Sequence, residues 1–203
     1  MIFSGISILG SIVVPVAVSQ WQFNYYKQSA LIDPMATNAI ETQDQDYTTI
    51  ENWFTGELPN RPAVISKVSY YTLSIPSIKL EEVSVEIDGT DLKKNAIQYP
   101  GTAIPGTYGN TVIFGHSTLP SLYKKFDPIS IFNPILKIKV GDEIEIYYDG
   151  ITYRYLVRET LEVSPTAIEV LTQRFDRHEL TLVTCTPLGT YLRRFVVRAE
   201  LVN

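Results

Sequence analysis

The stretch Glu143-Ile-Glu-Ile-Tyr-Tyr-Asp-Gly-Ile-Thr-Tyr-Arg-Tyr-Leu-Val157 contains two runs of alternating apolar and polar residues, joined by Asp149-Gly150. Alternation with a period of two is typical of a strand with one buried face. An Asp-Gly pair between two such runs favours a two-residue hairpin turn, because that turn needs positive φ at both of its central positions. The stretch therefore predicts a β-hairpin over residues 143–157.

Short β-branched and aromatic runs recur on both sides of this hairpin, separated by turn-forming pairs such as Asp88-Gly89 and Pro105-Gly106. The further runs cover residues 70–75, 83–87, 111–114, 180–184 and 195–202. Only a few short helices fit between them, near residues 91–95, 121–126 and 166–173. Regularly spaced short strands with few helices predict an all-β sandwich or a closed barrel.

The composition excludes several classes of protein. Of the 203 residues, 45% are hydrophobic and 19% are charged, which is an ordinary globular balance. Lys plus Arg is 17 and Asp plus Glu is 22, giving a net charge of −5, and no basic cluster favours nucleic-acid binding. With one Cys and two His, no intrachain disulfide can form and a structural zinc site is not expected. We therefore expect no metal and no cofactor.

The first 26 residues carry no charge, and the apolar run Ile2–Val18 comes close to the about 20 residues that span a bilayer. This run predicts an N-terminal apolar helix that anchors the chain in the membrane. Ala17-Val18-Ser19 leaves a cleaved signal peptide as an alternative, and a buried core helix as another.

The acidic stretch 27–66, punctuated by prolines, has no apolar period and predicts a solvated extracellular linker. Trp53 and Phe54 leave open that this stretch docks on the core or contains a short helix that begins near Thr48 or Thr49. The predicted domains are thus an anchor or signal segment at 1–26, a linker at 27–66 and a catalytic domain at 67–203.

Two apolar runs end in a chemically reactive residue that is followed at once by loop-forming residues. His116 follows Val112-Ile-Phe-Gly, and Cys185 follows Leu182-Val-Thr. A thiolate is a nucleophile, an imidazole can exchange protons with an amine, and a guanidinium such as that of Arg194 can hold an oxyanion. These residues by themselves also fit a buried thiol, a structural histidine and the solvent face of a strand. His178, in a polar turn, is expected to be structural or exposed.

Five ordered motifs resemble those of bacterial sortases, over about residues 68–202. Thr181-Leu-Val-Thr-Cys185 resembles the TLxTC signature, and Val112-Ile-Phe-Gly-His-Ser117 resembles the strand-end histidine motif. Arg194, nine residues after the cysteine, resembles the arginine of the last strand. Ser74-Ile-Pro-Ser-Ile-Lys-Leu80 and Tyr99-Pro-Gly-Thr-Ala-Ile-Pro-Gly106 resemble the early strand and the loop before the histidine strand.

The resemblance implies a closed eight-stranded barrel and a cysteine transpeptidase. Such an enzyme cleaves a C-terminal Leu-Pro-x-Thr-Gly-like sorting motif between Thr and Gly through a thioester, and transfers the protein to an amine of the cell wall. The resemblance makes Cys185 the nucleophile and His116 the general acid and base. Arg194 would hold the substrate backbone and the oxyanion, and Thr184 would line the substrate groove. Segment 162–177 would read the Leu-Pro part of the motif.

The implied partners are proteins with a C-terminal sorting motif and an amine acceptor, at a membrane whose outer side carries the catalytic domain. A wall-anchoring sortase of class D or E is favoured, because Asp33-Pro34-Met35 lacks the aromatic residue of the lid in pilin-polymerising sortases. That pilin-polymerising type, and a wall-associated β-barrel binding module without catalysis, remain alternatives. An L,D-transpeptidase fits poorly because no glycine precedes Cys185, and a papain-like protease because its cysteine precedes its histidine.

Overall fold

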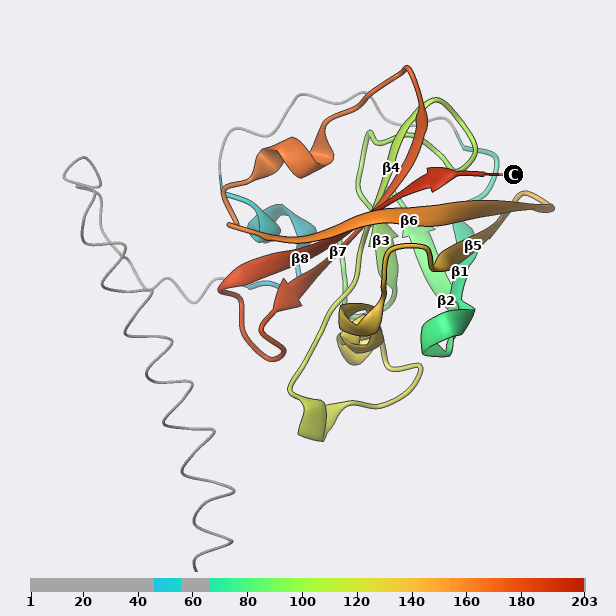
Figure 1. Ribbon diagram of the computed structural model, residues 1–203. Coiled ribbons are helices and arrows are strands. Elements are labelled where there is room, and N and C mark those ends of the chain that lie inside the picture. The colour runs from blue at the N-terminus through green and yellow to red at the C-terminus, as the bar shows by residue number, and fades with distance from the viewer. Residues whose placement is uncertain (1–45, 56–65, 203) are drawn as a thin grey trace, which may run out of the picture. The chain divides into compact units, whose positions relative to one another are not determined.

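The computed structural model describes residues 46–55 and 66–202, and in these residues eight strands close into a barrel (Figure 1). The strand order around the barrel is β1-β2-β3-β4-β7-β8-β6-β5. The strands are β1 (Tyr70–Ile75), β2 (Leu80–Ile87), β3 (Ala96–Gln98), β4 (Gly109–Phe114), β5 (Glu143–Tyr148), β6 (Ile151–Val163), β7 (His178–Thr186) and β8 (Arg193–Leu201). The β2–β3 and β4–β7 pairs are parallel, whereas the other six are antiparallel. The predicted closed eight-stranded barrel is confirmed.

The predicted hairpin is present as strands β5 and β6, which pair from Tyr148 and Ile151 outward. Asp149 and Gly150 have φ values of 48° and 82°, so both turn positions lie in the left-handed region that the Asp-Gly pair predicts. Strand β3 was not predicted. Its three residues are all buried, and a run that short shows no alternation.

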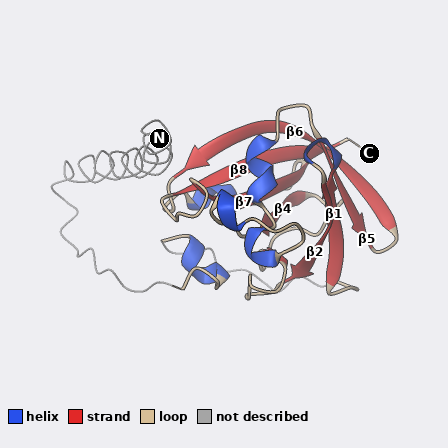
Figure 2. Ribbon diagram, turned by 90° about the horizontal axis from the view of Figure 1, so that it is seen from below, coloured by secondary structure: helices blue, strands red, loops and turns tan. Residues whose placement is uncertain are grey.

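All helices in the described residues are short 3-10 turns, shown with the strands in Figure 2. They are η1 (Ile50–Trp53), η2 (Pro76–Ile78), η3 (Pro120–Leu122), η4 (Pro128–Ser130), η5 (Asn133–Lys137) and η6 (Ile168–Leu171). Two predicted helices correspond to η3 and η6 in shortened form. The helix predicted at 91–95 is wrong: these residues form a turn in which the Asp91 carboxylate accepts a hydrogen bond from the Lys93 backbone N–H.

Strands β4 and β7 are buried on both faces, because each lies between two hydrophobic clusters. Side chains such as Ile113 and Leu182 point into the barrel. The alternate side chains, such as Phe114 and Val183, pack outside it in a second cluster that also contains Cys185. Strands with two buried faces can carry continuous apolar runs, as the last three residues of β4 do.

Residues 46–55, here called the strap, cover the outer face of β4 and β7. Ile50, Trp53 and Phe54 are buried in the second cluster, with Val170 and Leu171 of η6. The strap is the short blue-cyan segment near the orange η6 in Figure 1, and the Thr55 backbone N–H donates to the Pro165 carbonyl at 3.0 Å.

The preferred interpretation of this stretch as a solvated linker is therefore wrong for residues 46–55, and the docked alternative is confirmed. A tryptophan and a phenylalanine gain too much from burial to stay in water when an apolar strand face is available. The predicted apolar helix at 1–26 and most of the predicted linker lie outside the described residues, and the domain boundaries stay predictions. Among residues 46–55 and 66–202, no helix is long and apolar enough to cross a bilayer.

Candidate active site

The parallel pairing of β4 with β7 brings His116 and Cys185 to the same edge of the barrel. Phe114 pairs with Val183, and the two reactive residues each follow two positions later along their chains. The adjacent Ser117 links the two segments at this edge, because its hydroxyl donates to the Cys185 carbonyl at 2.8 Å. Two residues 69 positions apart in the sequence are thus fixed side by side by strand register.

Strand β8 places Arg194 directly opposite Cys185 in the antiparallel β7–β8 pair. Arg194 is completely buried, and its guanidinium lies with the second cluster on the Cys185 side. Its neighbour Arg193 is partly exposed and donates instead to the Glu162 carbonyl on β6. The structure therefore brings Arg194, rather than Arg193, next to the thiol, as the spacing predicts.

The guanidinium of Arg194 binds backbone carbonyls rather than a carboxylate. Nε and Nη2 donate to the carbonyl oxygen of Trp53 at 3.0 and 2.6 Å. Nη1 donates to the Tyr191 carbonyl at 2.9 Å. No acidic side chain in the described part of the chain forms an ion pair with Arg194. The Arg194 guanidinium is thus charged and oriented to donate hydrogen bonds to peptide carbonyl oxygens.

The strap covers the site through its aromatic side chains. The Trp53 ring lies 5.6 Å from the His116 ring, and the Tyr47 ring stacks on Tyr191 at 4.1 Å. Trp53 is held in turn by its indole N–H, which donates to the Tyr47 carbonyl at 2.7 Å. Under this cover His116 is 6% exposed and Cys185 is 1% exposed.

Burial dominates the titration of both reactive groups. It raises the pKa of the Cys185 thiol to about 11, although the nearby Arg194 guanidinium acts in the opposite direction. Burial also lowers the pKa of His116 to about 4, against the carboxylates of Asp46 and Asp91. At pH 7 the covered site therefore holds a neutral thiol beside a neutral imidazole.

Three neighbours fix the position of His116. The Thr184 hydroxyl donates to the carbonyl of Gly115 at 2.8 Å, and the Phe132 backbone N–H donates to the carbonyl of His116 at 2.9 Å. Gly115 itself has no room for a side chain, because a Cβ there would lie 2.5 Å from the Phe132 ring. Thr184, which was expected to line the groove, is fully buried and holds the histidine strand instead.

The segment expected to read the sorting motif, residues 162–177, is anchored to the barrel by Gln173. Its side-chain amide accepts from the backbone N–H groups of Ala103 and Asn110 and donates to the Asn110 carbonyl. Within this frame, η6 presents Val170 and Leu171 to Trp53 and Phe54 of the strap. The apolar side of η6 is thus covered by the strap.

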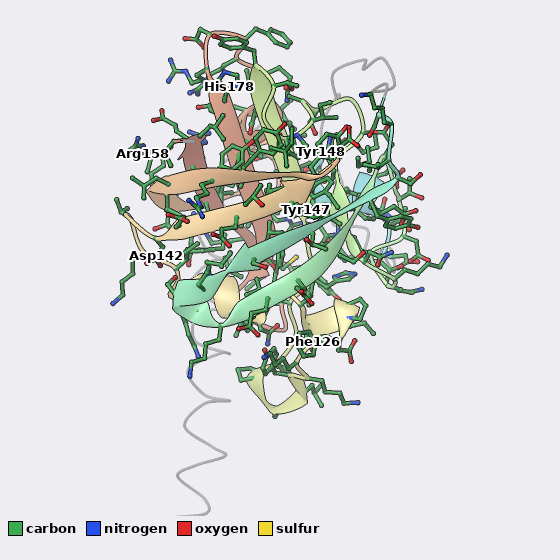
Figure 3. The ribbon with its side chains drawn as sticks, turned by 90° about the vertical axis from the view of Figure 1, so that its right-hand side faces the viewer. Phe126, Asp142, Tyr147, Tyr148, Arg158 and His178 are labelled. Carbon is green, nitrogen blue, oxygen red and sulfur yellow. The ribbon has the colours of Figure 1, made fainter. Side chains whose placement is uncertain are left out.

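The second histidine lies away from this site. His178 begins β7, seven residues before Cys185, and packs on Tyr108 at 4.0 Å. Figure 3 shows His178 at the end of the molecule opposite Phe126, which belongs to the segment after His116. The prediction that His178 is structural or exposed, rather than part of the site, agrees with this position. No group of His, Cys, Asp and Glu side chains in the described residues could hold a metal ion.

Comparison with known proteins identifies the class. The family model of the Sortase domain matches residues 73–202. Sortase A of Bacillus anthracis is 28% identical over 166 residues, which are 80% of this chain and 73% of that protein. Sortase D of Bacillus subtilis (strain 168) is 25% identical over 135 residues, which are 64% of this chain and 63% of that protein.

Solved structures agree with the sequence matches. The structure of a Clostridium perfringens Sortase D5 transpeptidase superimposes with a TM-score of 0.58 at 29% identity, covering 69% of this chain and 82% of that one. Sortase A from Corynebacterium diphtheriae gives a TM-score of 0.58 at 30% identity, over 71% of this chain and 62% of that one. The fold is therefore that of a β-barrel transpeptidase. The chain belongs to the sortase family, whose enzymes act on cell-wall sorting motifs.

Proposed function

We propose that this sortase cleaves a C-terminal Leu-Pro-x-Thr-Gly-like motif between Thr and Gly and transfers the protein to an amine of the cell wall. The observation that carries the proposal is the pairing of Cys185 with Arg194 across β7 and β8, where the guanidinium binds a peptide carbonyl. A carbonyl held beside a thiol is what attack on a peptide bond requires.

Acylation starts from the neutral pair. The His116 imidazole takes the thiol proton, and the Cys185 sulfur attacks the carbonyl carbon of the motif's Thr. Arg194 stabilises the oxyanion of the tetrahedral intermediate. The C–N bond to Gly then breaks, and the His116 imidazolium gives its proton to the leaving amine. The product is a thioester on Cys185, and no metal or cofactor takes part.

Transfer reverses these steps with another amine. The incoming amine attacks the thioester carbonyl while His116 takes its proton, and the C–S bond breaks as the new amide forms. The sulfur leaves as a thiolate, which His116 reprotonates. One imidazole thus serves first as base and then as acid in each half of the reaction.

The sorting peptide has to displace part of the strap, because the Trp53 carbonyl occupies the donors of Arg194. Burying Trp53 and Phe54 stabilises the covered state by about 1.5–3 kcal/mol per side chain. The apolar Leu-Pro part of the motif is suited to replace these contacts beside Val170 and Leu171 of η6. The strap is therefore a competitor for the substrate site within the same chain.

Amide exchange tests this function. The full chain is incubated with a panel of Leu-Pro-x-Thr-Gly peptides and a glycine amine, and products are read by mass spectrometry. We expect cleavage between Thr and Gly and a new amide at Thr, both absent with Cys185→Ala. A panel without exchanged product, or cleavage at another bond, would contradict the proposal.

The N-terminal sequence supports a proposal for the location of the enzyme. We propose that the apolar run within residues 1–26 anchors the chain and that the catalytic domain lies on the outer side of the membrane, where sorting motifs and wall amines meet. A fusion of a reporter to the C-terminus that is accessible to protease on intact cells supports this orientation. A reporter protected until lysis contradicts it.

A further inference from the structure

One pocket reaches His116 without contact to the buried strap residues Trp53 and Phe54. Its volume is about 240 Å³, and its walls come from Thr48 of the strap, Lys93, Leu119 after β4, and Tyr191 of the β7–β8 loop. Trp53, Cys185 and Arg194 do not line it. His116 is therefore the contact between two sites, one at Trp53 and one at this pocket.

The imidazole presents an unused polar atom at this point. The Nε2 atom of His116 is buried and has no hydrogen-bond partner among the described residues. Leaving a buried polar nitrogen unpaired costs about 1–3 kcal/mol, so the position favours a ligand that can hydrogen-bond. In the proposed reaction His116 exchanges protons with the leaving and the entering amine, and both amines occupy the same place relative to the thioester.

Lys93 gives the pocket its charge. Its side chain is exposed, and no carboxylate in the described residues lies within ion-pair distance of it. Its neighbour Lys94 differs, because its ammonium pairs with Asp91 at 3.3 Å. Burial has the largest effect on the pKa of His116; the carboxylates of Asp46 and Asp91 act against it, and the Lys93 ammonium acts in the same direction as burial. An ammonium near His116 and an anion near Lys93 both fit this arrangement.

We propose that this pocket receives the acceptor substrate and that Lys93 selects amines that carry a carboxylate close to the amino group. The inference rests on the proposed function and names the acceptor class for it. The amino group lies at Nε2 of His116, and the carboxylate lies at the Lys93 ammonium. Because Lys93 is exposed, its replacement leaves the core intact and tests charge alone.

The experiment compares two acceptors, glycylglycine and glycylglycinamide, which differ only in the terminal carboxylate. The full chain is acylated with a Leu-Pro-x-Thr-Gly peptide, and kcat/KM for each amine is measured at low and high salt. The readout is the ratio of the two values in each variant relative to wild type, since this ratio cancels the intrinsic reactivity of the amines. Lys94→Gln is the matched control.

We expect Lys93→Gln to lower the glycylglycine to glycylglycinamide ratio about two- to five-fold, the range of a solvent-exposed charge pair. Lys93→Glu should lower it further, and high salt should reduce the wild-type preference. Lys94→Gln should keep the wild-type ratio. If the thioester forms and both Lys93 variants keep the wild-type ratio, the acceptor proposal is overturned and the proposed function stands. If no thioester forms with any peptide, both are overturned.

Discussion

The Nη2 atom of Arg194 lies 2.6 Å from the carbonyl oxygen of Trp53, although 141 residues separate them in the sequence. This contact joins the last strand of the barrel to the strap and occupies donors that the proposed reaction assigns to its substrate. Under that proposal the strap and the substrate compete for one guanidinium, so this contact is the first one to change by mutation.

Arg194→Lys should reduce transpeptidation by about 100-fold or more, because an ammonium cannot donate from two nitrogens to one carbonyl and removes a fixed oxyanion donor. The measurement is kcat/KM for amide exchange. Arg198→Lys is the control, since Arg198 lies on the same strand and pairs with Glu159 away from the thiol. Equal losses of activity in the two variants would show that replacing either arginine disturbs β8, and that Arg194 has no specific role in the reaction.

Trp53→Leu should make Cys185 more reactive, because a smaller side chain covers the thiol and His116 less well. Less burial lowers the pKa of the thiol from about 11, so more thiolate is present at each pH. We expect alkylation of Cys185 to accelerate several-fold at pH 8, with the mass of the adduct as the readout.

Tyr147→Leu is the control for this variant, since Tyr147 is an exposed aromatic on β5. The thermal midpoint of each variant is measured alongside, so that faster alkylation is compared at equal folded fraction. An alkylation rate for Trp53→Leu equal to that of wild type would mean that the strap does not limit access to the thiol.

The stability of the protein should fall as the pH drops from about 6.5 toward 4, through His116. Its folded pKa is about 4 and its unfolded value is 6.5, so the unfolded chain binds a proton in this window while the folded chain does not. Stability is therefore present above pH 6.5 and is lost on acidification, by at most about 3 kcal/mol.

His116→Gln removes this titration and should flatten the dependence relative to wild type. Denaturant unfolding at pH 7 and at pH 4.5 measures the difference, and His178→Gln is the control for the other histidine of the chain. Carboxylates titrate in all three proteins, so only the difference between them counts. An identical pH dependence in wild type and His116→Gln would refute the buried neutral imidazole.

Thr184→Val should lower both stability and activity, whereas Thr184→Ser should retain most of each. Valine keeps the shape but leaves the Gly115 carbonyl unsatisfied, which costs about 1–3 kcal/mol. Serine keeps the hydroxyl that donates at 2.8 Å. Because Gly115 directly precedes His116, we expect kcat to fall more than KM rises. A valine variant with wild-type kcat would limit Thr184 to a packing role.

Much of the barrel could be predicted from local sequence because its signals are local. Alternation and Asp149-Gly150 define the β5–β6 hairpin, and the conformation of that turn agrees with the prediction. The parallel pairing of β4 with β7 is not local, so the meeting of His116 and Cys185 came from the family resemblance and not from periodicity. Strand register then supplies the physical reason for it.

The strap could not be predicted with the same rules. Polar and acidic residues surround Trp53 and Phe54, and local composition favours a linker there. What decides their position is an apolar face of β4 and β7 that exists only after the barrel has formed. The two adjacent aromatic residues were the one available signal. The sequence could not predict that Arg194 binds the Trp53 carbonyl, because every residue has a backbone carbonyl.

The most direct test of the account is the intact mass of the protein after brief reaction with a Leu-Pro-x-Thr-Gly peptide and rapid acid quenching. The account predicts a covalent adduct equal to the peptide up to Thr, located on Cys185, released by hydroxylamine and absent in Cys185→Ala and His116→Ala. An unmodified protein across the whole peptide panel, or an adduct that persists in Cys185→Ala, would contradict it.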